Sequence, residues 1–131
     1  MAWQFYNPNP VRTDGVGDCA VRAVAKALDM TWERAYVELC MNGFLMGDLP
    51  NSDLVWGSVL RLHGFSRDVI PNTCPDCFTV NDFCRDHPQG VFVLKSNGHV
   101  AAVRDGILYD SWDSGMNVPQ YYWYLPDEKK G

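Results

Sequence analysis

The sequence predicts an α+β fold with an N-terminal helical layer packed on a small antiparallel sheet. Apolar residues follow helical spacing up to Gly64, whereas β-branched and aromatic runs separated by turn residues follow it. Helices followed by antiparallel strands are typical of this class. With 131 residues, 47% of them hydrophobic, the chain suits one buried core, so we expect a single domain over residues 1–131.

Three helices are predicted in the first half. They span about 19–29, 31–42 and 53–63, with Thr or Ser at the N-cap of the second and third and Gly43 as the stop of the second. The stretch 1–17 is rich in Pro and Gly, which predicts an extended arm that leads into the first helix.

The second half predicts one short helix and several strands. The helix begins at Thr79, with Asp82 completing a capping-box pattern, and ends before Pro88. Residues 127–131 are charged and predict a solvated tail. Strands are predicted at 65–70, 91–94, 99–103, 107–112 and 121–125.

The dipeptide Asp105-Gly106 predicts a two-residue hairpin turn. Counting outward from this turn places His99 opposite Trp112 and makes Asp110 a diagonal neighbour of His99 on the same face of the sheet. Asp113 has the opposite parity. The register therefore selects Asp110 as the carboxylate beside His99.

A cysteine stands at the predicted start of the first helix, in Gly17-Asp18-Cys19. A helix N-terminus lowers the pKa of a thiol, and a nearby imidazole can take its proton. A third group then fixes the orientation and tautomer of the imidazole. Cys19, His99 and Asp110 therefore have the residue types and chain order of a cysteine hydrolase.

Three short motifs resemble the papain-like cysteine peptidase superfamily: Gly17-Asp18-Cys19, Gly98-His99 and Asp110-Ser111-Trp112. The resemblance implies a papain-like fold with Cys19 as nucleophile and His99 as general base and then acid. It also implies that Asp110 orients His99 in place of the family's Asn and that Trp112 shields the pair. The compact size is similar to that of bacterial or phage enzymes such as bacteriocin leader peptidases and cell-wall amidases.

The chain departs from the papain pattern at the oxyanion hole. The family places a Gln six residues before the cysteine, and this position is Thr13. Acyl transfer needs hydrogen-bond donors aimed at the developing oxyanion. We expect Asn7 or Asn9 of the arm to donate, Asn9 being the first choice, alongside the backbone N–H of Cys19.

These observations predict cleavage of a peptide, isopeptide or related amide bond in a protein or peptide substrate, without a cofactor. Two alternatives remain open at the level of sequence. One is a non-catalytic binding or inhibitor protein that uses the aromatic run 121–124; the other is an acyltransferase with the same triad. Low reactivity of Cys19 would favour the binding protein.

Five cysteines without a secretory signal favour free thiols over a disulfide framework. Four residues nevertheless have zinc-ligand spacing, Cys74, Cys77, Cys84 and His87. Part of this stretch has the pattern of a short buried helix, so buried or free thiols are the favoured interpretation and no metal is predicted. Zinc at these residues remains an alternative.

The net charge and the hydropathy of the sequence exclude some classes of binding partner. The net charge of −5 disfavours nucleic-acid binding, which depends on clustered Lys and Arg. The first residues lack a signal-peptide pattern and no apolar run reaches membrane-spanning length, which predicts a cytoplasmic protein without a membrane partner. The sequence leaves the oligomeric state open.

Overall fold

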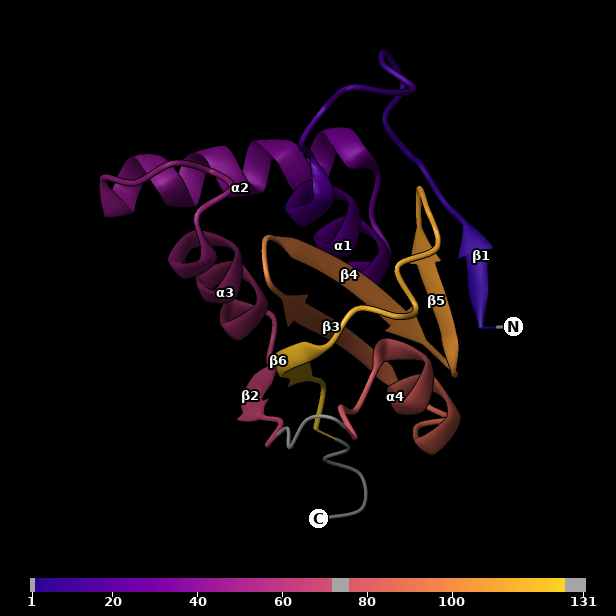
Figure 1. Cartoon of the computed structure of the whole chain (residues 1–131). Helices are drawn as coiled ribbons and strands as arrows, with labels where there is room; N and C mark the ends of the chain where they lie inside the picture. Colours follow the sequence, from indigo (N-terminus) through magenta and orange to yellow (C-terminus); the bar gives the residue numbers. More distant parts are fainter. Residues whose placement is uncertain (1, 72–75, 127–131) are drawn as a thin grey trace.

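Helices lie on both faces of a six-stranded sheet in the part of the chain that the structure, a computed structural model, describes: residues 2–71 and 76–126 (Figure 1). The elements in chain order are β1 (Trp3–Phe5), α1 (Cys19–Leu28), α2 (Trp32–Met46), α3 (Asp53–Leu62), β2 (Ser66–Val69), α4 (Val80–Asp86), β3 (Val91–Ser96), β4 (His99–Arg104), β5 (Ile107–Asp110) and β6 (Pro119–Tyr124). The strand order is β1-β5-β4-β3-β6-β2. The predicted α+β class is confirmed.

Helix α2 is longer than predicted and passes through Gly43. A Cβ at this position would lie 2.7 Å from the backbone carbonyl oxygen of Asp48, so glycine lets the chain after the helix fold back closely. The helix ends instead at Gly47, which has a φ of 70°. The sequence contains two plausible stops, and tertiary packing selects the second.

The sheet is mixed rather than purely antiparallel. Residues Trp3–Phe5 of the predicted arm form β1, which pairs parallel with β5 at the edge of the sheet. The Trp3 indole N–H also donates to the backbone carbonyl of Asp110 over 3.0 Å. Two aromatic side chains in three residues favour a strand, and the arm reaches the unpaired edge that β5 would otherwise expose.

The predicted hairpin turn is confirmed. Asp105 and Gly106 have φ values of 53° and 78°, as a two-residue turn with two left-handed positions requires. Arg104 pairs with Ile107, as counted from the sequence. The turn thereby sets the register of β4 against β5, which brings His99 at the start of β4 close to Asp110 at the end of β5.

Two hydrophobic cores lie on opposite faces of the sheet. The larger joins α1, α2 and α3 to the sheet through Val24, Trp56 and Trp123, among others. The smaller joins α4 to the other face through Phe83 and Leu108. Trp123 is only 4% exposed, so the run 121–124 is divided between the two cores and does not form the exposed aromatic patch expected of a binding protein.

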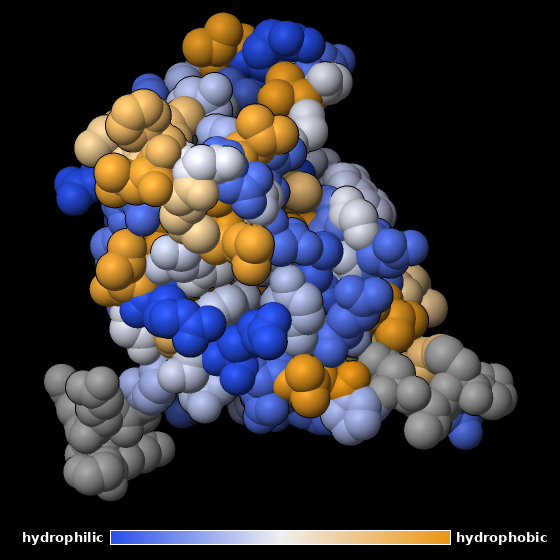
Figure 2. All heavy atoms as spheres, turned by 90° about the vertical axis from the view of Figure 1, so that its left-hand side faces the viewer, coloured by the Kyte–Doolittle hydropathy of each residue, from blue (hydrophilic) through white to orange (hydrophobic). Residues whose placement is uncertain are grey.

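Apolar side chains also remain on the surface. Figure 2 shows hydrophobic residues gathered over the upper part of the face that it views. The last turns of α2 and the loop after it contribute to the exposed set, which includes Met41, Phe44, Leu45 and Leu49. Within residues 2–71 and 76–126, no helix combines the length and the hydropathy that crossing a membrane requires.

Because α3 packs closely on the sheet at Gly57, we expect a side chain at this position to lower the stability of the fold. A Cβ there would lie 2.8 Å from Cζ2 of the buried Trp123 side chain. We expect Gly57→Ala to lower the free energy of unfolding by about 1–3 kcal/mol through overpacking, although alanine normally favours a helix by about 1 kcal/mol over glycine. Urea unfolding measures this change, with the half-buried Ser58→Ala of the same helix as control. Equal or higher stability of Gly57→Ala would contradict the packing described.

Candidate active site

Cys19 is the first residue of α1, and its side chain is half-buried. The N-cap residue Asp18 makes no side-chain hydrogen bond to the first turn, although aspartate is a favoured capping residue. Its carboxylate is held by other partners. The N–H groups at the positive end of the helix are therefore left uncapped by Asp18 beside the thiol.

His99 and Asp110 lie at neighbouring strand ends and form a hydrogen bond. The Nε2–H of His99 donates to Oδ2 of Asp110 over 2.6 Å. Since Nε2 is engaged, Nδ1 is the ring nitrogen that remains for Cys19, and the interaction with His99 lowers the pKa of the thiol. The structure thus brings all three predicted catalytic residues together in the order thiol, imidazole, carboxylate.

The interactions of Cys19 and His99 shift their pKa values in opposite directions. Burial raises the pKa of the Cys19 thiol, but hydrogen bonds from His99 and from the backbone of Val100, with the positive charges of His99 and Arg22, lower it overall. Burial lowers the pKa of His99, but its bonds to Asp110 and Cys19 raise it from 6.5 to about 9. Both shifts favour the thiolate of Cys19 beside the imidazolium of His99.

Asp110 is almost completely buried, with 2% of its surface exposed. Oδ1 accepts from the backbone N–H of Ser111 at 2.8 Å and from Nη2 of Arg22 at 3.3 Å. Oδ2 accepts from the hydroxyl of Ser114 at 2.6 Å as well as from His99. Burial raises the pKa of Asp110, but the hydrogen bonds from His99, Ser114 and Ser111 and the charge of His99 lower it overall. The carboxylate is therefore ionised and fixed in orientation.

Arg22 connects Asp110 to the start of the helix. It lies on α1 one turn after Asp18 and forms ion pairs with the carboxylates of both residues. Oδ2 of Asp18 also accepts from the Trp32 indole at 2.9 Å and from Nδ2 of Asn9 at 3.2 Å. Sequence analysis missed these roles of Asp18 and Arg22, and that of Ser114. A charged residue amid the Ala and Val of α1 was the available signal for Arg22.

Trp112 lies against His99, as the resemblance implies. The two ring centroids are 4.9 Å apart and the planes are inclined by 50°. Trp112 is 47% exposed, so it covers one side of the imidazole from outside and is not part of the core. An apolar cover of this kind limits the access of water to His99.

The oxyanion role expected of Asn9 is not supported by its hydrogen bonds. Its Nδ2 donates to Asp18, and its Oδ1 accepts from the backbone N–H groups of Val11 and Arg12. The amide of Asn7, the other candidate, donates to the backbone carbonyl of Thr13 at 3.1 Å. Both side chains organise the arm around Asp18. The backbone N–H of Cys19 remains the candidate donor to an oxyanion.

The four residues with zinc-ligand spacing do not converge as far as the structure describes them. Cys74 lies outside the described residues, and Cys77 is disulfide-bonded rather than a free thiol. Cys84 is buried in the smaller core, and burial raises its pKa to about 11. Nδ1 of His87 hydrogen-bonds to the carbonyl of Phe83. Within residues 2–71 and 76–126, no three His, Cys, Asp or Glu side chains form a metal-binding cluster.

Comparison with known proteins identifies no relative. No protein-family model, curated protein or solved structure matches the chain.

The raised pKa of His99 beside Asp110 predicts the pH at which the imidazole titrates. In an NMR pH titration, the imidazole of the wild-type protein should titrate near pH 9 and remain positively charged below it. Asp110→Asn removes the carboxylate charge that favours the imidazolium, so the midpoint should move down by at least about one pH unit. His99→Gln assigns the signal. A wild-type midpoint near 6.5 would contradict the proposed charge state.

The two ion pairs of Arg22 predict a second effect, because the compact ammonium of a lysine lacks the forked, planar donors with which the guanidinium reaches both carboxylates. We expect Arg22→Lys to lower the free energy of unfolding by about 1–3 kcal/mol and to slow alkylation of Cys19. The matched control is Arg104→Lys, since the hydrogen bonds that Arg104 donates within the described part of the chain go to backbone carbonyls of α1. Equal effects of the two substitutions on Cys19 alkylation would exclude a positioning role for Arg22.

Proposed function

We propose that the protein is a papain-like cysteine hydrolase that cleaves a peptide, isopeptide or related amide bond through an acyl-enzyme on Cys19. One observation carries the proposal: Cys19 and His99 interact so that the thiol pKa is lowered and the imidazole pKa is raised, and Nε2–H of His99 donates to the buried carboxylate of Asp110 over 2.6 Å. This combination prepares a nucleophile and an acid in the same resting state.

In the first half of the reaction, the Cys19 thiolate attacks the carbonyl carbon of the substrate and a C–S bond forms. The oxyanion of the tetrahedral intermediate faces the N-terminus of α1, where the Cys19 backbone N–H stabilises it. His99 transfers its proton to the leaving nitrogen as the C–N bond breaks. The products of this half are a free amine and a thioester on Cys19.

In the second half, neutral His99 takes a proton from water while the water oxygen attacks the thioester carbonyl. Collapse of the second tetrahedral intermediate breaks the C–S bond and releases a carboxylic acid. His99 is again an imidazolium and Cys19 again a thiolate. Asp110 keeps its charge throughout and holds the Nε2 side of the imidazole, so that Nδ1 faces the sulfur.

The alternative of a non-catalytic binding protein fits these observations less well. Binding does not require a thiolate paired with an imidazolium. The aromatic run 121–124, which a binding protein would expose, is largely packed within the two cores. The thiol of Cys19 is by contrast accessible enough to react, being half-buried rather than enclosed.

Alkylation by iodoacetamide tests the pairing of the Cys19 thiolate with the His99 imidazolium, and it needs no known substrate. The thiolate reacts by displacing iodide from the reagent, so the labelling rate reports the thiolate. Mass spectrometry of each cysteine across pH should show fast labelling of Cys19 below neutral pH and at least tenfold slower labelling in His99→Ala. Cys40, also half-buried, is the internal control. If Cys19 labels no faster than Cys40 in the folded wild-type protein, the proposal fails.

Turnover is tested with a proteome-derived peptide library and mass spectrometry of the products. Cys19→Ala and His99→Ala should abolish cleavage, with folding checked by circular dichroism. Asp110→Asn should keep part of the activity, because an amide oxygen can still accept from Nε2–H, whereas Asp110→Ala should lose more. Wild-type rates in Asp110→Ala would remove the role assigned to that residue.

A further inference from the structure

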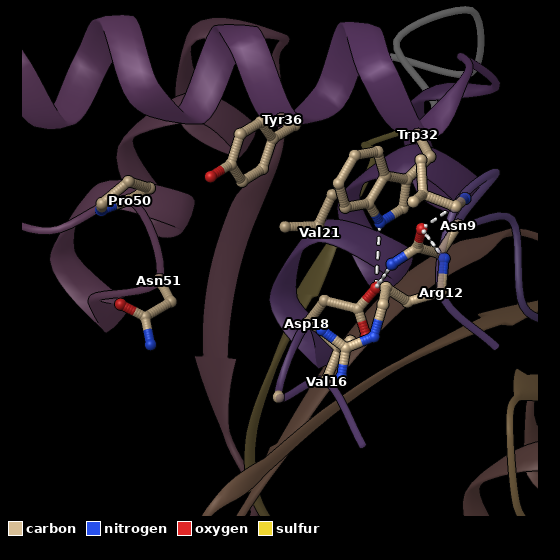
Figure 3. Close-up of a pocket in the computed structure, with 11 residues that line it drawn as sticks. Asn9, Arg12, Val16, Asp18, Val21, Trp32, Tyr36, Pro50 and Asn51 are labelled. Atoms are coloured by element: carbon tan, nitrogen blue, oxygen red, sulfur yellow. Dashed lines mark hydrogen bonds between the residues drawn. The ribbon is translucent and has the colours of Figure 1, made fainter. Parts of the chain in front are cut away.

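A pocket of about 370 Å³ lies beside the start of α1. The arm, α1, α2 and the loop between α2 and α3 contribute to its walls (Figure 3). Gly17 and Asp18, the two residues before Cys19, form part of the lining. The pocket is thus adjacent to the reactive thiol along the chain.

Most of the pocket surface is apolar or aromatic. Trp32 and Tyr36, one helical turn apart on α2, stack with ring centroids 5.0 Å apart and an interplanar angle of 7°. Val21 of α1 and Pro50 of the following loop add aliphatic surface. A wall of this kind favours a large apolar side chain over a small or polar one.

The pocket also carries an unpaired positive charge. Arg12 lines it and is exposed, and its guanidinium has no carboxylate partner within residues 2–71 and 76–126. The acidic residue in the lining, Asp18, is already paired with Arg22. The guanidinium of Arg12, which also lines a smaller neighbouring pocket with Asp14, is therefore the group of this lining that can bind a carboxylate.

The position of the pocket relative to His99 indicates which part of a substrate it receives. Because His99 protonates the leaving nitrogen, the leaving group must lie on the His99 side of the thiol. No residue of β4 or β5 lines the pocket, and neither does Trp112, which covers His99. The lining therefore leaves out the leaving-group side of the thiol, and the pocket is matched instead to the acyl part of the substrate.

We propose that this pocket is the acyl-side specificity site and that it selects peptides with a large apolar side chain next to an acidic residue. The apolar side chain lies against Tyr36 and Trp32, and Arg12 binds the neighbouring carboxylate. The inference rests on the proposed hydrolase function and defines the class of peptide that it cleaves.

Peptidyl fluoromethyl ketones test the inference, because the Cys19 thiolate displaces their fluoride and their peptide occupies only the acyl side. The set consists of acetyl-dipeptidyl reagents with Leu, Phe, Gly, Glu or Lys at each of the two positions. The wild-type protein should be inactivated about tenfold faster by Leu or Phe than by Gly at one position. Glu should be preferred to Lys at the other position.

Two variants assign these preferences to the pocket. Tyr36→Ala should reduce the Leu-to-Gly rate ratio by at least about threefold, and Arg12→Gln should remove the preference for Glu over Lys. Each preference is a ratio within one variant, so a general change in thiol reactivity cancels. Met41→Ala, an exposed position of α2 outside the pocket, is the matched control.

Iodoacetamide labelling of the same samples separates the two proposals. If Cys19 reacts rapidly with iodoacetamide but the ratios are the same in wild type, Tyr36→Ala and Arg12→Gln, the pocket is not the specificity site and the hydrolase proposal stands. If Cys19 shows no enhanced reactivity with iodoacetamide, the hydrolase proposal itself fails.

Discussion

The rest of the site depends on the hydrogen bonds that the buried carboxylate of Asp110 accepts. It accepts from four donors that come from α1, β4 and the segment after β5. A carboxylate removed from water is stable only when its oxygens are paired in this way. The same bonds fix the position of His99 relative to α1, so the network that stabilises the charge also aligns the imidazole with Cys19.

The start of α1 lacks the side-chain cap that its N-cap residue could provide. A capping carboxylate normally satisfies free N–H groups of the first turn and stabilises the helix. Here Asp18 pairs instead with Arg22 and accepts from Trp32, which leaves the first turn without that cap. Burial of nearly every position of α1 compensates through packing on the sheet. In the proposed mechanism, the N–H groups left free at the start of the helix are the donors to an oxyanion.

Local patterns in the sequence were sufficient to predict that Asp110 lies beside His99. They did not predict the residues that hold Asp110 in place. The turn chemistry of Asp105-Gly106 and the period of a strand were sufficient to select Asp110, because both act over a few residues. The pairing of Arg22 with Asp110 spans 88 positions and follows only from the packing of α1 on the sheet. The end of α2 and the parallel pairing of β1 were missed for the same reason, since close approach of distant segments decides both.

Trp32 links the proposed specificity pocket to the catalytic network. Its ring forms part of the pocket wall, and its indole N–H donates to the carboxylate that holds Arg22. A side chain bound against Trp32 would thus rest on a residue that contributes to the position of Asp110. Arg12 and Tyr36 make no hydrogen bond or ion pair to Asp18, Arg22 or Asp110 within residues 2–71 and 76–126. The proposed selection of substrate and the proposed activation of the thiol are therefore separable at Arg12 and Tyr36, but not at Trp32.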